Sequence, residues 1–176
     1  MSPVFTSLFT RLAPGTSGQV RRQSFGYWVA FAVFLADQAT KFWVHEFTPY
    51  AWSQPVTGYF NLVHVYNFGA AFSFLADAGG WQRFFFGAIA LVASVWLILV
   101  LRKPLHRIEH LAYALILGGA LGNGLDRGMR GYVVDFLDFY WNNWHWPAFN
   151  IADMGIVSGA ALLIFSSFRG PSGETV

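Results

Sequence analysis

The stretch from Phe84 to Leu101 contains no charged side chain. A helix that crosses a bilayer needs about 20 mostly apolar residues, because the hydrocarbon core offers no water to polar groups. We therefore predict a membrane-spanning helix over Trp81–Leu101. The composition agrees, since 55% of the 176 residues are hydrophobic and only 11% are charged, against about 25% in ordinary soluble domains.

Three further stretches have the length and composition of spans: 27–44, Leu111–Leu125 and Phe149–Phe168. The apolar run Tyr27–Ala36 follows two arginines and also has the pattern of a secretory signal peptide, but it continues to Val44, which favours a span. The sequence thus predicts an α-helical membrane protein with four transmembrane helices.

The basic residues predict the orientation of this bundle. Most of them lie before residue 24, in the loop Arg102–Arg107 or at Arg169, and none lies from His45 to Gly80. Because Lys and Arg are retained on the cytoplasmic side, both termini should be cytoplasmic. We expect residues 1–24 to be a mobile cytoplasmic lead, 25–168 a four-span membrane domain and 169–176 a cytoplasmic tail.

Both long loops should then lie on the side of the membrane opposite the cytoplasm. Residues 58–72 are rich in β-branched and aromatic residues and partly alternate, which predicts a short sheet on the membrane surface. Residues 132–146 carry three tryptophans suited to the lipid headgroup layer, and we interpret this loop as an interfacial helix.

Two carboxylates stand out, because each lies in an aromatic and almost charge-free context. Asp135 follows Val133 and Val134, and Asp153 follows Ile151 and Ala152. Burial raises the pKa of a carboxyl group, and two adjacent carboxyls cannot both ionise comfortably, so such a pair shares one proton. Paired aspartates of this kind carry out aspartic peptide hydrolysis, although proton-coupled transporters also contain intramembrane aspartates.

Other polar residues cluster near these acids. Asp37 and Lys41 are four residues apart and share a helical face, which favours a buried ion pair. Asn67 precedes a Gly-Ala-Ala turn, and its amide either holds an extended peptide or caps the turn. Asp126 is expected to form an internal network with Arg127 at the end of the third span.

Several classes of function are disfavoured. The chain has no cysteine, which excludes disulfides, a cysteine nucleophile and thiolate metal sites, and its formal charge of +2 is too small to indicate nucleic-acid binding. His106, Glu109 and His110 match the H-x-x-E-H pattern of inverted zincins. They lie beside a basic loop, however, so the start of an interfacial helix is favoured over a metal site.

A series of motifs, in order along the chain from Phe25 to Phe168, resembles the lipoprotein signal peptidases (signal peptidase II). These motifs are Asp37-Gln38-Ala39-Thr40-Lys41, residues 66–73, residues 118–127, Val133-Val134-Asp135-Phe136 and residues 147–153. Departures from the family pattern are small: Gly124 replaces a larger apolar residue, the lead is long, and Asp138 adds a further acid.

The resemblance implies an aspartic endopeptidase that removes signal peptides from prolipoproteins before a diacylglyceryl cysteine, on the periplasmic side of the bacterial inner membrane. It implies Asp135 and Asp153 as the catalytic residues. The implied substrate-binding residues are Asn67, Gly69, Asn123, Arg127 and Asn150, supported by Asp37, Lys41 and Asp126. The implied partners are diacylglyceryl-modified prolipoprotein, membrane lipid and globomycin-type inhibitors, with no nucleic acid, cofactor or metal.

Three alternatives remain open from the residues alone. A proton-coupled transporter would use Asp37, Asp126, Asp135 and Asp153 as a relay. A metalloprotease would use the two histidines and the glutamate of the H-x-x-E-H pattern. A non-catalytic assembly factor would need none of these acids.

Overall fold

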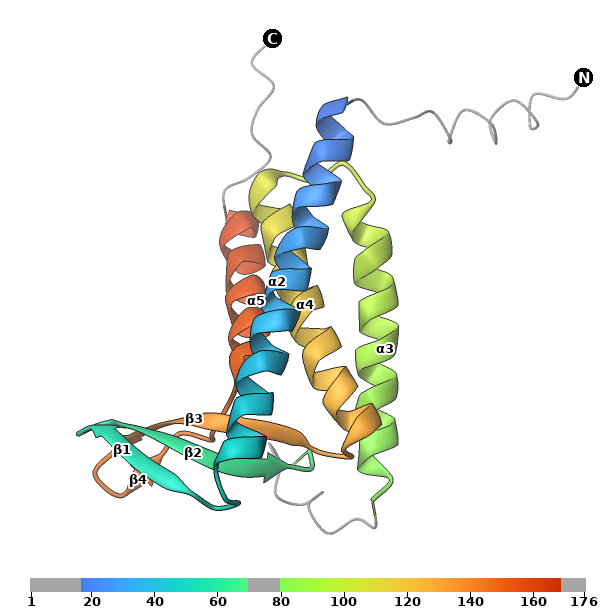
Figure 1. The fold of residues 1–176 in the computed structure, drawn as a ribbon. Coiled ribbons are helices and arrows are strands. Elements are labelled where there is room, and N and C mark those ends of the chain that lie inside the picture. The colour runs from blue at the N-terminus through green and yellow to red at the C-terminus, as the bar shows by residue number, and fades with distance from the viewer. Residues whose placement is uncertain (1–16, 70–79, 169–176) are drawn as a thin grey trace, which may run out of the picture.

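The computed structural model describes residues 17–69 and 80–168. Four helices run side by side, and a small sheet lies across one end of them (Figure 1). The helices are α2 (Ser17–Phe47), α3 (Gln82–Leu101), α4 (Arg107–Met129) and α5 (Ile151–Phe168). The first residue of α2 and the last residue of α5 lie at the end of the bundle opposite the sheet (Figure 1).

Helices cover the four stretches that were predicted as spans, with differences at their ends. Among the described residues, α3 and α5 are long and apolar enough to cross a membrane. Helix α3 begins one residue after the predicted start at Trp81. Helix α4 extends beyond the predicted stretch Leu111–Leu125 in both directions. The first helix begins at Ser17, within the segment expected to precede it. Residues 1–16 and 169–176, which hold the rest of the expected lead and the tail, lie outside the described residues.

Small residues bring α4 close to its neighbours. A Cβ added at Gly118 would meet Val33 of α2, and one added at Gly119 would overlap the carbonyl oxygen of Ala152 in α5. Gly159 of α5 faces the backbone of α4 in the same way. Such close backbone approach is how helices associate within a bilayer, where burial of apolar surface gives little driving force between helices.

The sheet has four antiparallel strands in the order β1 (Ser53–Thr57), β2 (Phe60–Asn67), β3 (Val133–Trp141) and β4 (Trp144–His145). The expected sheet over residues 58–72 is confirmed for β2, while 70–72 lie outside the described residues. Strand β2 pairs with β3 so that Val65 lies opposite Asp135. Val134 and Phe136 of β3 are buried against Val44 of α2, which fixes the sheet to the bundle.

The predicted interfacial helix over 132–146 is wrong, because this segment forms β3 and β4. Its residues are β-branched and aromatic, which favours strand, and the two strands are joined by Asn142 and Asn143. Asn142 adopts a positive φ of 52°, a conformation that asparagine tolerates in two-residue hairpin turns. The pairing with β2 satisfies backbone N–H and C=O groups of β3, which would have bonded to each other within a helix.

We predict that Gly119→Ala destabilises the bundle by about 1–3 kcal/mol, the usual cost of overpacking. Its Cβ would overlap the α5 backbone, which cannot move away as a flexible side chain can. Thermal unfolding in detergent measures the effect. The matched control is Gly128→Ala in the same helix, where nothing lies within 4 Å of the new Cβ. Equal unfolding temperatures for the two variants would contradict this account of the packing.

Candidate active site

The two candidate acids come from different elements and meet at the junction of bundle and sheet. Asp135 lies in β3 and is 2% exposed, and Asp153 lies in the first turn of α5. Asn150, directly before α5, joins them. Its side-chain amide donates to Asp135 Oδ1 at 2.6 Å, and its backbone N–H donates to Asp153 Oδ2 at 3.2 Å.

The start of α5 fixes the carboxylate of Asp153. Asn150 Oδ1 accepts the backbone N–H of Asp153 at 3.0 Å, while Asp153 Oδ2 accepts the backbone N–H of Asn150. This reciprocal arrangement is a capping box, and it satisfies N–H groups that a helix start leaves without partners. The capping asparagine is therefore also the residue that binds both acids.

Asn123 of α4 is the second residue that contacts the carboxylate of Asp153. Its amide nitrogen donates to Asp153 Oδ1 at 2.7 Å, and its Oδ1 accepts from Lys41 Nζ at 2.8 Å and from Asn150 Nδ2 at 3.3 Å. All polar atoms of its side chain are thus engaged. Asp153 is held through both of its oxygens by contacts with α4 and with its own helix start.

Asn67 at the end of β2 binds the other oxygen of Asp135. Its Nδ2 donates to Asp135 Oδ2 at 2.9 Å, and its Oδ1 accepts the backbone N–H of Gly69 at 2.9 Å. The turn-capping role considered for Asn67 is therefore observed, together with a contact to the acid. Gly69 has a φ of 109°, and a Cβ there would overlap the ring of Phe86, so this turn requires glycine.

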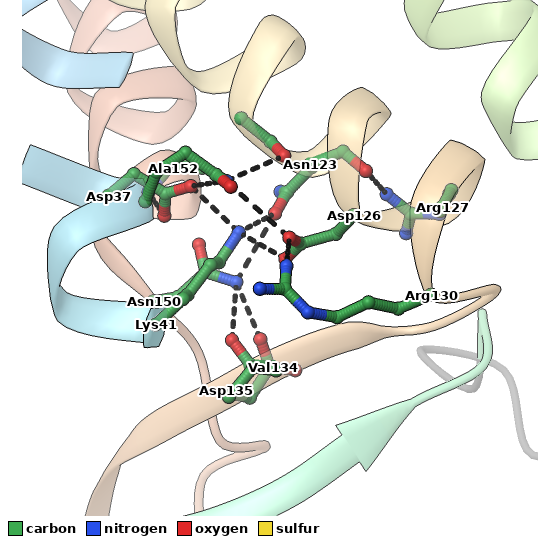
Figure 2. A network of polar contacts seen from close by, with 12 residues as sticks. Asp37, Lys41, Asn123, Asp126, Arg127, Arg130, Val134, Asp135, Asn150 and Ala152 are labelled. Atoms are coloured by element: carbon green, nitrogen blue, oxygen red, sulfur yellow. Dashed lines mark hydrogen bonds and ion pairs between the residues drawn. The ribbon is translucent and has the colours of Figure 1, made fainter. Parts of the chain in front are cut away.

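A buried ion cluster of Asp37, Lys41 and Asp126 lies close to Asp135 (Figure 2). Lys41 Nζ lies 2.8 Å from Asp37 Oδ2 and 2.9 Å from Asp126 Oδ2, and all three side chains are fully buried. Asp37 Oδ1 also accepts the backbone N–H of Ala152 at 2.8 Å. The predicted Asp37–Lys41 pair is confirmed, and it extends to α4 and α5.

The expected network between Asp126 and Arg127 is wrong. Among the described residues, the ion pairs of Asp126 are with Lys41 and Arg130, not with Arg127. Adjacent residues on a helix do not face each other, whereas residues four apart do. The Arg127 guanidinium instead donates to the carbonyl of Asn123 at 3.2 Å and lies 5.4 Å from the centre of the Phe86 ring.

Asp138 belongs to a separate cluster, although it lies in the same strand as Asp135. It accepts from Asn61 Nδ2 at 2.8 Å and lies 2.9 Å from His145 Nδ1. Successive side chains of a strand point to opposite faces, so residues three apart face different sides. The structure therefore joins Asp135 to Asp153, and not to Asp138, through shared hydrogen-bond donors.

Burial raises the pKa of Asp135 to about 7, and the nearby negative charge of Asp153 adds to this shift. The hydrogen bonds from Asn67 and Asn150 act in the opposite direction. A carboxyl group with this pKa holds or releases a proton near neutral pH, which is what general acid–base chemistry requires.

The H-x-x-E-H segment has a local structural use. His106 caps the start of α4, and Glu109 accepts the backbone N–H of His106 at 3.2 Å, which completes a capping box. His110 is buried within the helix bundle. Within the described part of the chain, no three histidine, aspartate or glutamate side chains are grouped as metal ligands would be.

Known proteins resemble the chain in both sequence and fold. The sequence model of the family described as signal peptidase (SPase) II matches residues 29–169. A lipoprotein signal peptidase of Serratia marcescens is 53% identical over 140 residues, covering 80% of this chain and 82% of that protein. One from Cupriavidus necator is 54% identical over 145 residues, covering 81% and 83%. A solved structure described as a bacterial membrane enzyme has a TM-score of 0.75 at 28% identity and covers 87% of this chain and 95% of its own.

We predict that Lys41→Met lowers the free energy of unfolding by about 3–5 kcal/mol, the usual cost of removing one partner from a buried ion pair. The variant would leave two carboxylates, Asp37 and Asp126, buried without this cation. Thermal unfolding in detergent measures the loss. The control Lys103→Met removes an exposed lysine and should unfold like the wild type. A stable Lys41→Met protein would show that the cluster contributes little.

The raised pKa of Asp135 predicts a pH-dependent stability difference. Between about pH 4 and pH 7 the folded protein holds a proton on Asp135 that the unfolded chain releases, so this carboxyl lowers the stability progressively as the pH rises to about 7. Asparagine does not titrate. The unfolding temperature of Asp135→Asn relative to wild type should therefore be higher at pH 8 than at pH 5. A difference that stays constant with pH would contradict the burial of a titrating carboxyl here.

Proposed function

The chain belongs to the signal peptidase II family, whose members are membrane proteases that remove signal peptides from prolipoproteins, and we propose that it does so with Asp135 and Asp153 as a catalytic pair. One observation carries this proposal. Asn150 donates to both carboxylates, so the two acids form one hydrogen-bonded unit. Asp37 and Asp126 also share a neutral donor, Gln38, but both contact the ammonium group of Lys41, whereas no ion pair formed by the described residues includes Asp135 or Asp153.

The environments of the two acids suggest their roles. Asp135 is the acid that holds the shared proton, in keeping with its raised pKa, and it donates a hydrogen bond to the oxygen of the scissile carbonyl. Asp153, held at the positive end of α5, takes a proton from the attacking water. The water oxygen adds to the carbonyl carbon, and the proton taken up by Asp153 then passes to the leaving amine as the C–N bond breaks.

The remaining polar groups around the pair are proposed to bind the peptide. Arg127 has no carboxylate within ion-pair distance among the described residues, so its planar fork of donors is available for substrate carbonyl groups. Gly69 follows Asn67 in its turn, and Asn67, Asn123 and Asn150 contact the acids directly. Their hydrogen bonds to the acids keep the pair in position while the peptide is bound in an extended form.

An apolar groove within the helix bundle fits a lipid-modified substrate. The groove has a volume of about 580 Å³ and lies between α2, α3 and α4. Gly87 and Ala90 of α3 line one wall, and Gly124 and Leu125 of α4 line the other. Because the groove lies between three helices of the bundle and its lining is almost entirely apolar, we assign it to the acyl chains of the diacylglyceryl cysteine. Globomycin-type inhibitors are proposed to occupy the same region, next to the acid pair.

We propose that all four helices cross the inner membrane, with both termini cytoplasmic and the acid pair at the periplasmic side. Helices α2 and α4 have 31 and 23 residues, which exceeds the roughly 20 needed to span. Asp37 and Lys41, both in α2, neutralise each other within the bundle. The sheet and the acid pair share the end of the bundle opposite the basic loop Arg102–Arg107, as the positive-inside rule requires (Figure 1).

Asp135→Asn and Asp153→Asn are expected to lower cleavage of a diacylglyceryl-modified precursor by about 10²–10⁴-fold, the usual contribution of a positioned acid or base. Precursor and product are separated by gel electrophoresis after reaction in detergent. Asp138→Asn is the matched control, because Asp138 is a buried aspartate of the same strand that does not contact the pair. An inactive Asp138→Asn with an active Asp135→Asn would show that the pair is misassigned.

The same assay separates the alternatives. Loss of cleavage on chelation, or in His110→Ala, would favour a metalloprotease. Normal processing by both variants of the pair would favour a non-catalytic factor. A proton relay would need carboxylates spread across the membrane, whereas Asp37, Asp126, Asp135 and Asp153 all lie in one connected network, which supports hydrolysis instead.

A further inference from the structure

Three arginines in the described residues lie at the end of the bundle nearest the sheet: Arg83, Arg127 and Arg130. In the proposed orientation this end is periplasmic, where basic residues are disfavoured. Arg127 is proposed to bind substrate. Arg83 and Arg130 line a different cavity and have no role in the chemistry described above.

The cavity lies between the end of β2, the start of α3 and the turn after α4, and it has a volume of about 680 Å³. Its lining includes Phe68, Trp81, Arg83, Arg130 and Gly131. Gly131 has a φ of 83°, and a Cβ there would lie 3.5 Å from the Arg83 side chain. The Arg83 side chain therefore lies next to Gly131, the residue that follows Arg130, and both arginines line one space.

The charge of this cavity is positive. Arg130 is paired with Asp126, and Lys41 with Asp37, so the buried cluster behind the cavity is neutral as a whole. Arg83 takes part in none of the ion pairs formed by the described residues, and its guanidinium carbon lies 4.5 Å from the centre of the Phe84 ring. The first turn of α3 contains no acidic residue, and the Trp81 side chain makes no capping hydrogen bond. The positive end of a 20-residue helix therefore adds to the charge of Arg83.

The surface beside the cavity is suited to the lipid headgroup layer. Trp81 is 49% exposed and Phe84 67% exposed, and both lie at the start of a helix long and apolar enough to span a membrane. Tryptophan at such a position is typical of the membrane–water interface. A ligand in this cavity would thus have an anionic group next to the two arginines and an apolar part along α3.

We propose that this cavity binds the phosphate of an anionic membrane phospholipid, with Arg83 as the principal ligand and Arg130 as the second. Charge-assisted hydrogen bonds from guanidinium to phosphate supply the affinity. The lipid tails would continue along the apolar surface of α3. The bound lipid would hold the first turns of α3 in place, and these turns include Phe86, on which Arg127 packs.

Lipid binding to the purified full-length protein in neutral detergent tests this proposal. Thermal unfolding is followed while phosphatidylglycerol, phosphatidylcholine or inorganic phosphate is added. We expect phosphatidylglycerol to raise the unfolding temperature of the wild type, and Arg83→Gln to weaken the apparent lipid affinity by about tenfold, as expected for loss of one charge-assisted bond. Arg83→Lys should retain part of the effect. Lys103→Gln, which removes an exposed charge from the opposite end of the bundle, should behave like the wild type.

Three results would overturn the proposal. Equal weakening in Arg83→Gln and Lys103→Gln would indicate attraction to the overall charge of the protein. An equal response to phosphatidylcholine would indicate a general effect of lipid. An equal response to inorganic phosphate would identify a free anion as the ligand. Because unfolding is measured without substrate, the outcome is independent of whether Asp135 and Asp153 cleave prolipoproteins.

Discussion

The buried ammonium group of Lys41 is the interaction on which the rest of the structure depends. It contacts the carboxylates of Asp37 and Asp126 and the amide oxygen of Asn123. Asp37 in turn accepts the N–H of Ala152 in the first turn of α5. A charge is tolerated inside a bundle only when it is paired and hydrogen-bonded. The contacts of Lys41, together with those of its partner Asp37, therefore join α2, α4 and α5 next to the candidate acids.

The acids themselves are held by neutral groups rather than by this cation. Asp135 accepts hydrogen bonds from the side-chain amides of Asn67 and Asn150, and Asp153 from the side-chain amide of Asn123 and the backbone N–H of Asn150. A cation in direct contact would keep the Asp135 carboxyl ionised. Neutral donors fix its position, and burial then raises its pKa to about 7. The arrangement combines fixed geometry with a proton that remains available near neutral pH.

The sequence alone indicated a large part of the fold and the identity of the candidate residues. Apolar stretches predict helices because each helix satisfies its own backbone, and the four-residue spacing of Asp37 and Lys41 predicts their pair because both lie on one helical face. These signals are local. Where the decisive partner is distant, the sequence-based interpretation was wrong: the segment 132–146 forms strands because β2 lies beside it, and Asp126 pairs with Arg130 and with Lys41 from another helix.

The sequence by itself determined which residues carry charge in an apolar chain, and therefore where chemistry is to be sought. Only the tertiary structure decided how they meet. Asp135 comes from a strand and Asp153 from a helix start, and they are joined by an asparagine that is also a helix cap. No spacing along the chain encodes this contact, because it arises from the docking of the sheet on the bundle through Val44, Val134 and Phe136.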